Sequence, residues 1–244
     1  MLRLFSAGSG EEVAALDASE FDAMVAERGS TVASLKRHLA ETLFEKRYSR
    51  FQLRILREGD TELRDEEGIA FAENLQLMLL NHLPPDENRD KSFLKSCADG
   101  LVDQVDRDLR GAQDPNIKDE NGAGALFQAA SRGHLEVCRL LLDAGADLEA
   151  VDDAGLRPLH SAAEAGHVQL VRLLLDAGAE LEAEDEGGDR PLHEAVFNNH
   201  VEVVGLLLAA GADGTAENHD GEEPKTIAAE RGYEAILELL RADR

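Results

Sequence analysis

Histidines are the residues of this 244-residue chain with the clearest potential for metal binding or acid–base chemistry. Five of the eight recur with a 33-residue spacing, His134, His167 and His200 in one series and His160 and His193 in another. The sequence contains no HExxH, no GxSxG and no glycine-rich loop ending in Lys-Ser or Lys-Thr. Because each recurrence falls in a new structural unit, we expect these histidines to bond the backbone. We predict no catalytic residue, metal site or cofactor, and therefore no enzyme.

Cysteines and carboxylates narrow the functional class further. Cys97 and Cys138 form no CxxC motif and fall where small apolar helix residues belong, which predicts buried thiols in a reducing compartment. We expect the cytoplasm, with the nucleus as the alternative. Fifty acidic residues against 25 basic ones give a formal charge of −25, so the surface repels nucleic acid and anionic lipid. No apolar stretch approaches the length of a membrane span.

The elements that position these residues form a repeat. Glycines recur with the same 33-residue spacing in three series, and Asn199 fills the one missing slot: Gly122, Gly155, Gly188 and Gly221; Gly145, Gly178 and Gly211; Gly133, Gly166 and Gly232. Pro158 and Pro191 suit the first position of a helix, and the third series suits a left-handed turn between two helices. The pattern predicts units of helix, turn, helix and loop that stack into an array.

Leu156-Arg157-Pro158-Leu159-His160, His167–Val171 and Ala177-Gly178-Ala179 resemble the landmarks of the ankyrin-repeat family. The resemblance implies an all-α solenoid over 91–244, with a degenerate first repeat at about 89–118. Three central repeats follow at 119–217, and a truncated capping repeat occupies 218–244. The family has a Thr-Pro-Leu-His box, which Arg157–His160 resembles, and its last residue is called the box histidine below. The threonine of this box is replaced by Arg157, Arg190 and Glu223, so we expect a helix-capping bond to be lost at each.

Residues 1–85 lack the 33-residue period. Strand patterns at 1–5, 13–16, 51–56 and 75–79, with a helix expected at 31–39, resemble the ubiquitin-like β-grasp fold. The expected architecture is therefore two domains, an α+β ubiquitin-like domain at 1–85 and the solenoid, joined by a linker at 86–90. The last strand runs on into the chain without a diglycine, so the domain cannot be a conjugated modifier as it stands. The resemblance implies an apolar binding patch at Leu56 and Met78, although the polar Gln76 at the third position of the patch weakens the match. The alternative is that these residues are ordinary surface residues of the sheet without a binding role.

Acidic pairs at the expected loop tips supply the remaining recognition signal. They recur once per unit, so their fields add along one edge of the array and favour a partner with a basic segment. The alternative is that they only keep the protein soluble. Phe197 is either an aromatic anchor or the filler of a local gap. The predicted partner-binding residues are Asp119, Glu120, Asp152, Asp153, Leu156, Asp185, Glu186, Asp189, Phe197, Leu56 and Met78.

The predicted function is that of a monomeric, non-enzymatic adaptor that binds protein partners and neither nucleic acid nor membrane. The array would bind one protein, and the ubiquitin-like domain would contact another. The alternatives are a substrate-recognition component of a ubiquitin ligase or proteasome-linked system, and a structural spacer without a high-affinity partner.

Overall fold

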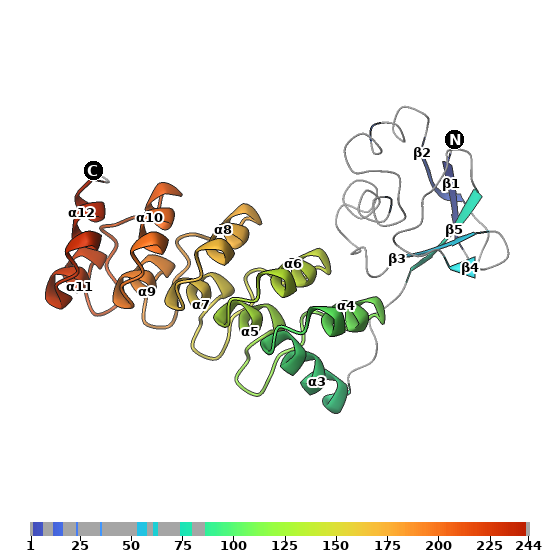
Figure 1. Ribbon diagram of the computed structural model, residues 1–244, viewed down its shortest axis with the longest axis horizontal. Helices are drawn as coiled ribbons and strands as arrows, with labels where there is room; N and C mark the ends of the chain where they lie inside the picture. Colours follow the sequence, from blue (N-terminus) through green and yellow to red (C-terminus); the bar gives the residue numbers. More distant parts are fainter. Residues whose placement is uncertain are drawn as a thin grey trace. The chain divides into compact units, whose positions relative to one another are not determined.

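A computed structural model gives the structure of the protein (Figure 1). It describes residues 86–242 without interruption. Before them it describes five short strands and the single positions Ala23 and Leu35. Within the described residues, no helix has the length and apolar character needed to cross a membrane.

The five strands form one mixed sheet in the order β2-β1-β5-β3-β4. Strand β1 pairs in parallel with β5 and antiparallel with β2, while β3 is antiparallel to both β5 and β4. The strands are β1 (Leu2–Ser6), β2 (Glu12–Leu16), β3 (Leu53–Arg57), β4 (Thr61–Glu62) and β5 (Asn74–Leu79). The four strands expected from the sequence coincide with β1, β2, β3 and β5 to within two residues.

Leu35 is helical and completely buried. It lies in the helix expected at 31–39, whose other residues are outside the described ones. The expectation of a complete ubiquitin-like domain over 1–85 likewise extends over residues outside the described ones.

Residues 86–242 form five helix pairs that stack side by side (Figure 1). The first helices of successive pairs contact one another from α3 to α11, and α8, α10 and α12 form a second row. The helices are α3 (Glu87–Ala98), α4 (Val102–Arg110), α5 (Ala125–Ser131), α6 (Leu135–Asp143), α7 (Pro158–Glu164), α8 (Val168–Asp176), α9 (Pro191–Phe197), α10 (Val201–Ala209), α11 (Pro224–Arg231) and α12 (Glu234–Ala242).

The segment expected as a linker at 86–90 is helical from Glu87 onward. Asp86 is the reason, because its carboxylate accepts the Arg89 backbone N–H at 2.9 Å and caps the helix. Asp90 closes the same turn from the other side by accepting the Asp86 backbone N–H at 3.1 Å. A polar stretch that resembles a connection in the sequence is therefore the start of the first repeat.

Close packing between repeats explains the small residues of the first helices. Ala162 and Ala163 in α7 are completely buried, as are Ala129 and Ala130 in α5. Leu174 of the second helix α8 is also completely buried, because α8 packs against α7 of its own pair and α10 of the next.

The two cysteines are buried thiols, as predicted. Burial raises the pKa of the Cys138 thiol to about 12, so the thiol stays protonated and unreactive. Cys97 in α3 is completely buried as well. Both side chains therefore serve the packing of the array.

Histidines join successive repeats through the backbone, as the sequence predicts. The Nε2 atoms of His134 and His200 each lie 2.8 Å from a carbonyl of the preceding repeat, at Ala98 and Glu164. His167 lies 3.3 Å from the Ser131 carbonyl in the same way. Each ring therefore satisfies a carbonyl at the end of the neighbouring first helix.

The box histidines carry out a second structural task. His160 Nδ1 accepts the Arg157 N–H at 3.3 Å, so Nε2 holds the proton and faces the Ala183 and Asp189 carbonyls at 3.0 and 3.2 Å. Burial lowers the pKa of His160, which favours this neutral form. His193 repeats the arrangement one unit later, toward the Ala216 and Glu222 carbonyls.

Arg157 and Arg190 compensate for the threonine that they replace. The backbone N–H of each is bonded by the box histidine, and the guanidinium forms ion pairs instead of a hydroxyl cap. Arg157 bonds the preceding repeat's Glu149 and Glu180 of its own repeat, while Arg190 bonds Glu182 and Glu184. The expected loss of the side-chain capping bond is therefore confirmed at Arg157, Arg190 and Glu223, and the two arginines form ion pairs in its place.

Substitution of Gly166 tests how tightly the turn between the two helices of a repeat is packed. Its backbone is left-handed, with φ +75°, and a Cβ there would lie 2.5 Å from His200 Nδ1. We expect Gly166→Ala to lower the free energy of unfolding by about 3 kcal/mol. Roughly 1–2 kcal/mol of this comes from the left-handed backbone and the rest from the displaced histidine. Urea unfolding of the full chain, followed by circular dichroism, measures the change.

Gly178 is the matched control for this substitution. It is also left-handed, with φ +94°, but a Cβ added there would meet nothing within 4 Å. Gly178→Ala should therefore cost only the backbone share of ~1–2 kcal/mol. Equal losses in the two variants would contradict the packing role assigned to His200.

Candidate protein-binding face

Each loop between repeats ends in a tight turn, called a fingertip here, that is closed by the side chain of its first residue. The four fingertips begin at Asp119, Asp152, Asp185 and Asn218. Asp152 Oδ1 accepts the backbone N–H groups of Ala154 and Leu156, at 3.0 and 2.9 Å. Asp185 bonds Gly187 and Asp189 in the same way, both at 2.8 Å. The same arrangement occurs in the first and last fingertips, around Asp119 and Asn218. One oxygen of each predicted tip aspartate is thus committed to holding its own turn.

The second residue of each fingertip faces solvent. Glu120, Asp153 and Glu186 are all exposed, and the exposed His219 takes this position in the last fingertip. Glu120 forms an ion pair with Lys91 at 3.4 Å, whereas no ion pair is seen for Asp153 or Glu186 among the described residues. The backbone N–H groups of Asp153 and Glu186 bond the preceding fingertip, at Asn121 and Ala154, so the tips form a regular edge. The charges available to a partner along this edge are therefore those of Asp153 and Glu186.

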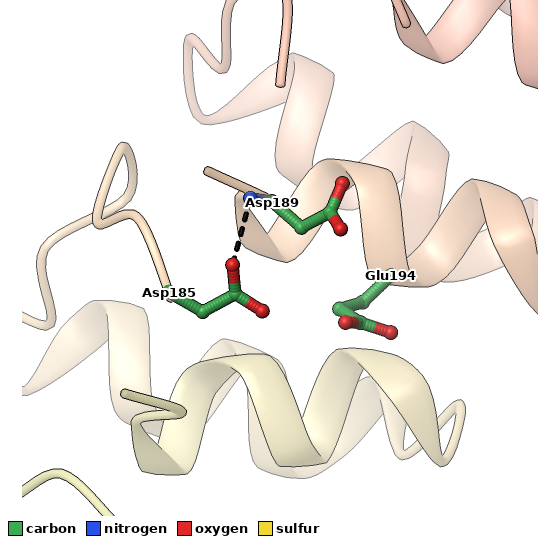
Figure 2. A group of neighbouring side chains, drawn as sticks. All are labelled: Asp185, Asp189 and Glu194. Atoms are coloured by element: carbon green, nitrogen blue, oxygen red, sulfur yellow. Dashed lines mark hydrogen bonds between the residues drawn. The ribbon is translucent and has the colours of Figure 1, made fainter. Parts of the chain in front are cut away.

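Three carboxylates converge beside the third fingertip (Figure 2). Asp185 and Asp189 extend from the fingertip and Glu194 from α9, and one oxygen of each lies within 4.8 Å of the others. This is the one group of His, Cys, Asp or Glu side chains within the described residues that is close enough to share a cation. Asp189 Oδ1 also accepts the Asn218 side-chain N–H at 2.8 Å, which joins the group to the last fingertip.

The pKa of Glu194 is raised by its surroundings. Burial raises the pKa of Glu194 to about 7, and the charges of Glu164, Asp189 and Asp185 raise it in the same direction. Among the described residues, no lysine or arginine forms an ion pair with it. At neutral pH, Glu194 is consequently divided between its protonated and ionised forms, and a nearby cation would favour the ionised one.

A hollow of about 260 Å³ opens next to Glu194. Its lining is acidic and partly apolar, and comprises Asp189, His193, Glu194, Phe197, Asn218, Asp220, Glu222 and Ile227. Phe197 is 48% exposed, and the Arg231 guanidinium lies 3.6 Å from its ring centroid. The phenylalanine therefore does not fill a gap in the core; it offers an aromatic surface to solvent and to cations.

The predicted binding residues do not form one site. Asp185, Asp189 and Phe197 lie at the C-terminal end of the array near Glu194, while Asp119 and Glu120 belong to a fingertip two repeats earlier. Leu156 is half-buried and takes part in its turn through its backbone N–H. Leu56 and Met78 lie in β3 and β5, where the register pairs them with Gln76 and Arg54. Their side chains are outside the described part of the protein.

Glu194 is the residue that sequence reasoning missed. It follows the box histidine directly, in a row of positions with Gln128, Ser161 and Ile227 at the same place in other repeats. Gln128 bonds Asp119 at 2.8 Å, so this position faces the fingertip in more than one repeat. Reading the 33-residue register for variable positions, as well as for constant ones, could have found Glu194.

The raised pKa of Glu194 predicts a pH dependence of stability. From about pH 4.5 to about 7 the carboxyl ionises in the unfolded chain but remains protonated in the folded one, so folding loses stability as pH rises. Glu194→Gln should remove this loss. We expect equal unfolding free energies for variant and native chain near pH 4.5, and a variant more stable by ~1–2 kcal/mol at pH 8, allowing for partial exposure.

Urea unfolding at both pH values measures this difference. Glu202→Gln, which removes the same charge from an exposed position in α10, is the control and should show no such divergence. If the Glu194→Gln variant is no more stable than the native chain at pH 8, ionised Glu194 does not destabilise the fold and the prediction is wrong.

Comparison with known proteins agrees with the architecture of the array. A family profile described as ankyrin repeats in three copies matches residues 93–185, and an ankyrin-repeat profile matches 187–219. Ankyrin repeat domain-containing protein 46 of Rattus norvegicus and of Mus musculus are each 41% identical to this chain over 49 residues. The match spans 20% of this chain and 22% of each relative, about a fifth of their length. With both profiles and the stacked helix pairs in agreement, the chain belongs to the ankyrin-repeat proteins.

Proposed function

We propose that the protein is an adaptor whose repeat array binds a basic segment of a partner protein. Ankyrin repeats are protein–protein interaction modules, and no catalytic family is indicated. The proposal rests on three acidic side chains that have no ion-pair partner among residues 86–242. They are Asp153 and Glu186 on the fingertip edge and Glu194 beside the hollow. Since these charges recur along one side of a stacked array, an extended basic chain matches them better than a compact partner does.

We assign a second binding function to residues 1–85, as a ubiquitin-like domain. The order β2-β1-β5-β3-β4, with parallel central strands, supports this assignment, and so does the buried helical Leu35. The register places positions 56 and 78 two residues apart across neighbouring strands, on one face of the sheet. A surface there for ubiquitin or proteasome components would make the protein a recognition subunit of such a system. The two buried thiols favour a reducing compartment, the cytoplasm or nucleus.

Salt dependence tests the proposed role of the array. The probe is a fluorescein-labelled 12-residue peptide of alternating arginine and serine, and its anisotropy is measured with the full chain at about 50 and about 300 mM salt, a range over which the Debye length roughly halves. We expect affinity to fall at high salt and to fall about 10-fold at low salt in the variant Asp152→Asn, Asp153→Asn, Asp185→Asn, Glu186→Gln. The loss is modest because exposed pairs contribute only ~0–1 kcal/mol each.

These substitutions preserve the fold because an asparagine can close a fingertip. Asn218 already does so, accepting the Asp220 and Glu222 backbone N–H groups at 3.1 and 2.9 Å. The control variant removes four charges from the second helices, through Glu136→Gln, Asp176→Asn, Glu202→Gln and Glu238→Gln. Affinity that ignores salt, or an equal loss in both variants, would reject the fingertip edge as the binding surface.

A further inference from the structure

We propose that the hollow between α9 and α11 is a subsite for one arginine side chain of the partner, whose guanidinium lies on the Phe197 ring and is bonded by Glu194 and Asp189. This inference rests on the proposed function and specifies one contact within it. The hollow contains both chemical features that an arginine uses, a carboxylate pair and an exposed aromatic side chain, and the rest of its lining is His193, Asn218, two further acids and Ile227.

The aromatic surface is the first feature that selects a guanidinium. Phe197 is half exposed at the hollow, at the end of α9, although it is one of the largest apolar side chains of the array. The chain's own Arg231 lies over the ring at 3.6 Å, which shows that a planar cation stacks there. Arg231 does not line the hollow, so its stacking leaves the cavity itself open. An arginine gains from such stacking more than a lysine does, because its charge is spread over a plane.

The carboxylates are the second feature. Glu194 and Asp189 both line the hollow, and their oxygens belong to the group that lies within 4.8 Å. Two carboxylates at this separation suit the fork of N–H donors on a guanidinium. Asp220 and Glu222 of the last fingertip add negative charge to the lining, and the described residues provide no lysine or arginine ion pair to Glu194. A partner's arginine would supply the positive charge that this lining lacks.

The volume of the hollow fits a single side chain. About 260 Å³ is room for one arginine and some water, and is small for a folded element. Ile227 provides an apolar wall from α11 for the methylene stem of such a side chain. A bare metal ion would use the carboxylates but neither Phe197 nor Ile227, so the mixed lining favours the amino acid side chain.

The NMR signal of the Ile227 methyl group can be used to measure binding in the hollow. The chain has few isoleucines, and labelling their methyl groups with ¹³C gives a short NMR spectrum of the full chain in which Ile227 reports on the hollow. The probe is the capped peptide Gly-Gly-Arg-Gly-Gly, compared with the same peptide carrying neutral citrulline. We expect the arginine peptide to shift the Ile227 methyl saturably, with Ile117 and Ile236 unmoved, and the citrulline peptide to have no effect.

Matched variants separate the subsite from general attraction to an acidic protein. Glu194→Gln should raise the dissociation constant at least 5-fold, and Phe197→Leu several-fold. Glu202→Gln, with the same loss of charge in α10, should change it less than 2-fold. Equal losses in Glu194→Gln and Glu202→Gln, or equal shifts with citrulline, would overturn the subsite. So would a shift of Ile227 by calcium chloride with none by the arginine peptide.

The two proposals fail in different ways. If Ile227 stays still while the 12-residue peptide binds with the expected salt dependence, the subsite is wrong and the acidic edge remains the binding surface. If neither peptide binds, the subsite and the proposed basic partner are both wrong.

Discussion

Polar backbone groups at the edge of one repeat are satisfied by the next, and the rest of the array depends on this constraint. A single helix pair cannot bury its apolar faces or bond all its terminal carbonyls by itself. Histidines therefore reach across to the neighbouring first helix, and acceptors in the loops repeat the same exchange. The side chains of Asn116, Glu149 and Glu182 each accept a backbone N–H from the following repeat, at Asp147, Glu180 and Asp213. The sequence has a 33-residue period because the residues that make these bonds recur once in each repeat.

This exchange divides the surface into positions with structural duties and positions free to vary. Asp152 and Asp185 hold their turns with one carboxylate oxygen, and Asn218 does the same without a charge, so the oxygen matters there more than the charge. The residue that follows, by contrast, is aspartate, glutamate or histidine in different fingertips. The position after the box histidine holds glutamine, serine, glutamate and isoleucine in successive repeats. Ser161 and Ile227 are buried at that second position, so recognition can change without loss of the fold chiefly at the exposed fingertip position.

The sequence predicts the repeated part of the array well because its signals are local and recur. Glycine, proline and histidine at fixed offsets are enough to place the helix pairs and the backbone bonds of His160 and His167. Interactions between distant residues are what it does not reveal. Asp86 and Asp90 turn an apparent linker into a capped helix, and Arg157 forms an ion pair with Glu149 of the preceding repeat. The pKa of Glu194 depends on Glu164 of the preceding repeat and on burial that only the stacked structure creates. For residues 1–85 the alternating strands could be predicted, and they coincide with the strands of the sheet.

Glu194 is a cost to folding that a repeat array is well suited to carry. A half-buried carboxyl beside two aspartates disfavours its charged form, and that penalty acts mainly on the repeats of α7, α9 and α11 that surround it. In a solenoid, stability is approximately a sum of repeat and interface contributions, so neighbouring repeats such as that of α5 can offset a local loss. The completely buried alanines and leucines of α5, α7 and α8 provide such a reserve of packing. A destabilising acid can thus remain in the array, and the binding of a cation at that point would recover part of the free energy that folding gave up.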